Sequence, residues 1–95
     1  MPEMHMSILW PDGSEEHCYS PSLVLKDYFR VGNSYPLADF RARSRTALTI
    51  AGERVRAKFG FSCSRAAHQL ARIEQRCLVF ADLPDAQVRV KAFHE

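Results

Sequence analysis

The sequence predicts an α+β fold, a two-layer sandwich in which two long helices cover one face of a three-stranded sheet. Alternation of apolar and polar residues marks strands near both ends of the chain. Between them, two long segments carry apolar residues at every third or fourth position, as amphipathic helices do. A length of 95 residues with 46% hydrophobic and 25% charged residues suits a single globular domain over residues 1–95. We therefore expect the element order β-β-α-α-α-β.

The first two strands form a hairpin. Met4–Trp10 alternates strictly, and Pro11–Ser14 combines proline, aspartate and glycine in the order of a tight turn. Glu15–Ser20 is the returning strand. A turn of this kind sets the register of the two strands and places Met6 opposite Cys18 on the core side.

Three helices are expected to follow. Leu23–Phe29 forms a short first helix. Asn33 and Ser34 can cap the second helix, with Pro36 in its first turn, because short polar side chains accept hydrogen bonds there and proline fits the first helical positions. The apolar stripe of the second helix runs over Leu37–Phe59.

The second helix contains Gly52, which costs about 1 kcal/mol relative to alanine. The helix either kinks there or another backbone packs closely against it. Ser62 or Ser64 can cap a third helix, which extends to about Ala81. The last strand, Ala86–Phe93, lies beside the first strand, which is the most apolar and takes the middle of the sheet. The direction of that last strand stays open.

The sheet face turned away from the helices is the first candidate interaction surface. In this register it collects His5, His17, Tyr19, Arg89, Lys91 and Phe93. Such a face fits a homodimer or another protein partner, a plain solvated surface, or the bases and phosphates of a nucleic acid. His5 and His17 lie diagonally across the strands without a third ligand nearby, so we expect no metal site.

Charge is distributed unevenly along the chain. Leu37–Arg76 contains nine basic and three acidic residues, a balance of +6, whereas the remainder has four basic and eight acidic residues, a balance of −4. The candidate basic surface on the second helix consists of Arg41, Arg43, Arg45, Arg54, Arg56 and Lys58. A run of this kind usually forms a solvated helix surface, but it could also bind nucleic acid through phosphate contacts or a base-reading third helix.

Cys63 is the candidate reactive thiol. It is expected near the start of the third helix, where the helix dipole favours a thiolate. His68, five residues further on, points elsewhere around the helix, so burial of Cys63 as a small apolar residue is the alternative. The three cysteines form no CxxC pair, and their odd number argues against a disulfide framework.

Several functional classes are not indicated. No stretch of about 18 apolar residues is present, so we expect no membrane association. Met1–His5 lacks the basic start and apolar run of a signal peptide, so we expect a cytoplasmic protein. No phosphate loop, paired-carboxylate site, catalytic triad or dinucleotide fingerprint occurs. We therefore expect no enzyme activity, no catalytic residues and no cofactor.

Several strings of residues resemble a known family. They are Trp10-Pro11-Asp12-Gly13-Ser14-Glu15, Cys18-Tyr19-Ser20-Pro21-Ser22, Ser34-Tyr35-Pro36-Leu37-Ala38-Asp39-Phe40 with Arg43-Ser44-Arg45-Thr46-Ala47-Leu48, and Glu53-Arg54-Val55-Arg56-Ala57-Lys58 with Gly60-Phe61. Together they resemble the nitrogen starvation response proteins, a family of small bacterial proteins, from Met1 to about Phe93. The resemblance implies a conserved gene cluster that also encodes a nitrilase-type enzyme and a radical SAM protein. It implies no catalytic residues, and it favours a cytosolic accessory protein over a free-standing enzyme.

The sequence supports three functional hypotheses. The first is a non-catalytic accessory or interaction protein of the nitrogen starvation response, a homodimer in contact through the exposed sheet face or an edge strand, together with the basic helix surface. The second is nucleic-acid binding through Leu37–Arg76. The third is a small thiol enzyme that uses Cys63.

Overall fold

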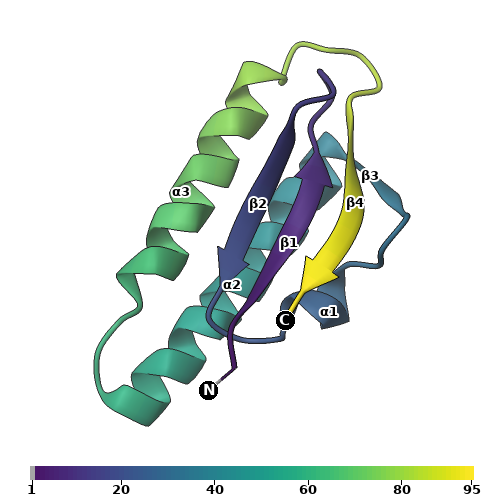
Figure 1. Cartoon of the computed structure of the whole chain (residues 1–95). Helices are drawn as coiled ribbons and strands as arrows, with labels where there is room; N and C mark the ends of the chain where they lie inside the picture. Colours follow the sequence, from purple (N-terminus) through teal and green to yellow (C-terminus); the bar gives the residue numbers. More distant parts are fainter. Residues whose placement is uncertain (1) are drawn as a thin grey trace.

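The computed structural model describes residues 2–95 and contains three helices and one four-stranded antiparallel sheet in the order β2-β1-β4-β3 (Figure 1). The elements are β1 (Met4–Leu9), β2 (Glu15–Ser20), α1 (Leu25–Tyr28), β3 (Ser34–Pro36), α2 (Leu37–Phe59), α3 (Ser64–Val79) and β4 (Gln87–His94). The predicted α+β class is confirmed. The predicted number of strands is wrong, because the sheet has four strands and not three.

The hairpin of β1 and β2 has the predicted register. Met6 lies opposite Cys18, and both are fully buried. The turn is closed by two backbone hydrogen bonds of 2.8 Å, from Trp10 N–H to the Ser14 carbonyl and from Gly13 N–H to the Trp10 carbonyl. Gly13 has a φ of 85°, a left-handed conformation that glycine adopts without strain. The turn chemistry therefore determines which residues of β2 face the core.

The fourth strand, β3, occupies residues that the sequence analysis assigned to a helix cap. Tyr35 pairs with Val88 of β4 and is only 7% exposed. Its hydroxyl accepts a hydrogen bond of 2.8 Å from the Arg30 N–H. A residue that precedes proline disfavours the helical region, so Tyr35 before Pro36 is extended and α2 begins only at Leu37. Three residues are too few to show an alternating pattern in the sequence.

The helix α2 is continuous through Gly52, so the predicted kink is absent. The alternative of a close backbone contact is also wrong, because a Cβ atom at Gly52 would meet nothing within 4 Å. The helix ends at Gly60, whose φ is 79° and whose N–H bonds the Arg56 carbonyl at 2.8 Å. This left-handed C-cap reverses the chain toward α3.

The last strand, β4, runs antiparallel to β1 and contains an irregularity. Ile8 lies opposite Val90, whereas the preceding residue Ser7 lies opposite Ala92. Lys91 is therefore an extra residue on β4, as in a β-bulge. Beyond the bulge, every residue of β4 has changed sides relative to a regular strand.

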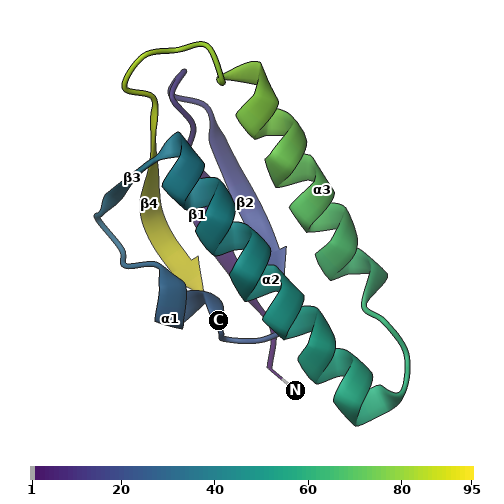
Figure 2. The same cartoon turned by 180° about the vertical axis from the view of Figure 1, so that it is seen from behind.

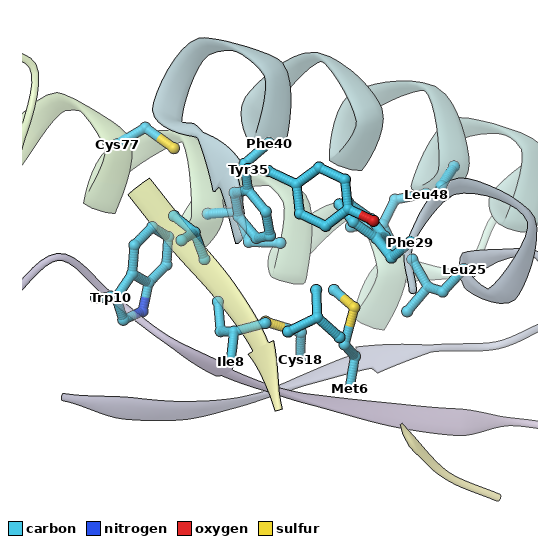
Figure 3. Packing of buried hydrophobic residues seen from close by; sticks show 14 of the residues in the cluster. Met6, Ile8, Trp10, Cys18, Leu25, Phe29, Tyr35, Phe40, Leu48 and Cys77 are labelled. Carbon is cyan, nitrogen blue, oxygen red and sulfur yellow. The ribbon is translucent and has the colours of Figure 1, made fainter. Parts of the chain in front are cut away.

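The core lies between the sheet and the helices (Figure 3). Aromatic rings of Trp10, Phe29 and Phe40 meet at its centre, with Trp10 and Phe40 centroids 5.6 Å apart. Phe40, on the first turn of α2, is completely buried. Edge-to-face contacts of this kind add to the stabilisation from burial.

The helix α2 lies across one face of the sheet, and α3 lies beside α2, next to the β2 edge (Figure 2). The fully buried apolar residues of α2 include Phe40, Ala47 and Ala51. The second long helix, α3, packs beside α2 and along β2. Within residues 2–95, no helix covers the opposite side of the sheet (Figure 1).

Candidate functional site

The side of the sheet that no helix covers presents a mixed surface, which we call the open face. Its side chains alternate with core residues along β1, β2 and β4. They are His5, Ser7, Leu9, Glu15, His17, Tyr19, Arg89, Lys91, Ala92 and His94.

Imidazole rings dominate the centre of the open face. The rings of His17 and His94 stack with centroids 5.5 Å apart and an angle of 15° between their planes. Nε2 of His94 lies 2.8 Å from Oγ of Ser7, which is only 2% exposed. His5 contacts Tyr19 edge-on, with centroids 5.6 Å apart. The centre is therefore an ordered surface of rings.

The charged groups of the open face largely neutralise each other. Glu15 lies 2.7 Å from Nζ of Lys91 and 3.0 Å from Nε2 of His17. These partners, above all the hydrogen bond from Lys91, lower the pKa of the Glu15 carboxyl. Arg89 forms no ion pair with another residue in the range 2–95.

The contact between Ser7 and His94 resembles a nucleophile beside its base. Acyl transfer would also need free N–H groups for the developing oxyanion. Ser7 lies in β1, which pairs with a strand on each side, so its neighbours' N–H groups serve the sheet. Among residues 2–95, no cluster of three histidine, cysteine or acidic residues is arranged to hold a metal ion.

Five of the six residues predicted for this face lie on it, and the exception is Phe93. That prediction is wrong, because Phe93 lies opposite the buried Met6 and packs against the core. The bulge at Lys91 exchanges the two sides of β4, so His94 takes the place expected for Phe93. A regular alternation over 87–94 contains no signal of the bulge, and the sequence analysis missed both His94 and its contact with Ser7.

The edges of the sheet are less available than the open face. At the β2 edge, Oε1 of Gln69 on α3 accepts a hydrogen bond of 2.9 Å from the Tyr19 N–H. At the other edge, β3 has three residues and ends at Pro36, which has no N–H to offer. Short strands, proline and side-chain cover all discourage pairing with another chain.

The candidate basic surface of α2 is partly neutralised within the chain. Glu74 of α3 pairs with Arg45 and lies 3.8 Å from Nε of Arg41. Arg43 pairs with Asp39 at 3.0 Å and also donates to the Tyr28 carbonyl. Nη1 of Arg54 donates to Oγ of Ser22, and Arg56 and Lys58 form no ion pair within residues 2–95.

The seam between α3 and the hairpin pairs the basic half of the chain with the acidic half. Arg72 lies 2.7 Å from Glu16, and Arg76 lies 3.8 Å from Asp12. The guanidinium of Arg65 lies 3.8 Å from the centre of the Tyr19 ring and 3.6 Å from Glu3. The basic residues of α3 therefore pair with acidic residues of the N-terminal part of the chain. These ion pairs leave fewer free cations to bind phosphate groups.

Cys63 is the residue that precedes α3, and it is half-buried. Its side chain lines a hollow of about 220 Å³ together with Val55, Phe59 and Phe61. His68 lines a different hollow, so the structure brings no imidazole to the thiol there. Cys18 and Cys77 are buried, and burial raises the pKa of both thiols.

Comparison with known proteins gives one positive result. The family model of nitrogen starvation-induced protein NitG matches residues 5–93. No curated protein and no solved structure shows a significant match. No helix within residues 2–95 is both long enough and apolar enough to cross a bilayer. Because the matched segment includes almost the whole chain, the chain belongs to the family of nitrogen starvation-induced protein NitG.

Proposed function

We propose that this chain is a non-catalytic interaction protein of the nitrogen starvation response and that it acts as a homodimer joined through the open face. The observation that carries the proposal is the surface of stacked imidazoles, centred on His17 and His94, that no other part of residues 2–95 covers. Family membership supports the association with nitrogen starvation.

The composition of the open face suits a protein contact. The centres of protein interfaces are poor in charged residues and rich in aromatic ones. The centre of this face consists of His5, His17, His94 and Tyr19, with the small residues Ser7 and Ala92 between them. Its acid–base pair, Glu15 with Lys91, leaves no net charge at that position.

A second copy is the partner that this charge pattern favours. In a two-fold symmetric dimer, each patch meets the same patch of its partner, so a strongly charged surface would repel itself. On the open face, Glu15 and Lys91 carry opposite charges and can exchange partners across a symmetry axis without net repulsion. The sheet edges supply fewer free N–H groups, since Gln69 covers part of β2.

The two alternative functions have weaker support. Nucleic-acid binding needs free cations, whereas Glu74 and Asp39 pair with Arg45 and Arg43 on the basic surface. Thiol catalysis needs a base within reach of the nucleophile, and no hydrogen bond joins Cys63 to a base in residues 2–95.

Sedimentation of a charge variant tests the dimer. We expect the wild-type chain to sediment as a dimer in the micromolar range and the variant His17→Glu to be a monomer, because a carboxylate at the centre of a self-facing patch meets its own copy. His68→Glu is the matched control, since it makes the same substitution at an exposed residue of α3. We expect this control to remain a dimer.

The result that would overturn the proposal is equally direct. A wild-type chain that remains monomeric at several hundred micromolar excludes a dimer of useful affinity. A dimer that tolerates His17→Glu but dissociates with His68→Glu would place the interface on the helices. Far-ultraviolet circular dichroism of each variant shows whether the fold is retained.

A further inference from the structure

Two exposed apolar patches lie at opposite ends of the molecule, which measures 42 × 23 × 18 Å. The large apolar residues that are more than half exposed are Val31, Phe59, Phe61, Leu78, Val79 and Leu83. All of them except Val31 belong to one of the two ends of the helix layer. Clustered apolar exposure of this kind marks a contact surface more often than scattered single residues do.

The first patch is the phenylalanine tip, formed by Phe59 and Phe61 at the turn between α2 and α3 (Figure 1). Their ring centroids lie 6.0 Å apart. The left-handed conformation of Gly60 brings the two rings to the same side of the turn. Phe61 is 64% exposed and Phe59 is 51% exposed, so the backbone holds two large rings in solvent.

The second patch is the end hollow, a cavity of about 380 Å³ between the start of α2, the end of α3 and the loop before β4. It is lined mainly by apolar side chains, among them Leu37, Leu78 and Leu83. Leu78 and Leu83 are 66% and 52% exposed and form part of its wall. A hollow of this size and lining can accept an aromatic side chain.

The charges beside the two patches are complementary. Arg56 and Lys58 flank the phenylalanine tip, and neither forms an ion pair within the described chain, residues 2–95. Asp85 lines the end hollow, Asp82 lies between its lining residues Ala81 and Leu83, and both acids are likewise without an ion pair in that range. Arg41 also lines the hollow, but its charge is partly offset by Glu74, 3.8 Å away. Opposite charges around two apolar patches orient one patch toward the other.

We propose that the end hollow binds the phenylalanine tip of a second copy of this chain. A single molecule cannot make the contact itself, because α2 has 23 residues and separates the two patches by about 35 Å. The contact is head-to-tail, so a pair of copies still has one free tip and one free hollow. Successive copies form a closed ring if the rotation between neighbouring copies adds up to a full turn. Otherwise they form an extended chain. The contact uses no residue of the open face and is independent of the proposed dimer.

Complementation between two variants tests this contact. All chains carry His17→Glu, so that association through the open face does not contribute. We expect this parent to be a monomer in the low micromolar range, since its open face is altered, and to self-associate in sedimentation equilibrium as its concentration rises to several hundred micromolar. Phe61→Glu and Leu83→Glu should each weaken the association by about 30-fold or more, because each places a carboxylate in the apolar contact. An equimolar mixture of the two variants should form a complex of two chains and nothing larger, since each supplies the patch that the other lacks.

Three results would overturn the proposal. They are a parent that remains monomeric at several hundred micromolar, a Phe61→Glu variant that associates as well as the parent, and a mixture that stays monomeric. The matched control is Val31→Glu, which changes an apolar residue of similar exposure, 53%, outside both patches. Association that Val31→Glu abolishes as strongly as Phe61→Glu would also contradict the proposal. Because the open face is already altered in every chain, failure here leaves the proposed dimer intact.

Discussion

The two faces of the sheet are made from alternate residues of the same strands, yet their packing differs throughout. On β1, Ile8 is completely buried beneath the helices, whereas its neighbour Leu9 lies on the open face and is only partly buried. On β2, Cys18 is 1% exposed and His17 is exposed. The covered face is apolar because helices exclude water from it. The open face orders its polar groups by contacts such as that of His17 with His94. One face therefore carries the stability of the fold, and the other is available for contact.

The largest expected effect separates two adjacent residues of β1. Ile8→Ala leaves a cavity beneath the helices and should lower the free energy of unfolding by about 2–5 kcal/mol. Leu9→Ala removes a similar volume from the open face and should cost less than about 1 kcal/mol in the monomer. Urea unfolding monitored through Trp10 fluorescence measures both. Equal losses for the two variants would show that the open face is as well packed as the covered one.

Alkaline pH should act on the covered face through Cys18. Burial raises the pKa of its thiol above the ordinary value of 9.0, and that of Cys77 to about 11. The folded state thus holds protons that the unfolded state releases, so the stabilisation is complete below pH 9 and is lost as the pH rises through the folded pKa. Each buried thiol should cost up to about 1.4 kcal/mol per pH unit in that window.

Unfolding measured between pH 8 and pH 10.5 checks this expectation. Cys18→Ala removes one of the two buried thiols and should make the decline with pH shallower. A decline that is unchanged in this variant would mean that the Cys18 thiol is ionised with equal ease in the folded and unfolded states. Tyr19, whose pKa burial also raises, contributes in the same direction in both proteins.

The smallest expected effect concerns the helix layer that distinguishes the two faces. A Cβ atom at Gly52 has free space, and the residue is inside a regular helix. Gly52→Ala should therefore raise the free energy of unfolding by about 0.5–1 kcal/mol, since alanine has less backbone freedom to lose on folding. Thermal unfolding gives the sign. A destabilised variant would show that α2 must move closer to another element than the structure places it.

Local patterns predicted the elements well where the signal extends over several residues. The alternation of β1 and the turn at Gly13 predicted the hairpin and its register. The apolar stripe from Leu37 to Phe59 coincides with α2, although the prediction had also placed Pro36 in the first turn of that helix. The strand β3 was missed because its three residues, which end at Pro36, have the composition of a helix start. They form a strand only because they pair with β4, which is distant in the chain.

The candidate site was predicted in part, and the error has one cause. His5, His17 and Tyr19 lie on strands whose register a local turn determines, and they share the open face as predicted. Phe93 and His94 lie beyond the bulge at Lys91, where the alternation changes sides. A bulge arises from the pairing of β4 with β1, and the residues of β4 alone do not reveal it.

The sequence by itself determined the properties that depend on neighbours in the chain: the helix stripes, the hairpin turn, and the family to which the chain belongs. The tertiary structure alone decided which residues meet across large distances in the chain. It brought His94 to Ser7, and it set the basic residues of α3 against the acidic residues of the hairpin. The physical reason is that periodicity and turn chemistry act over a few residues, whereas strand pairing and interlayer contacts depend on how the whole chain packs.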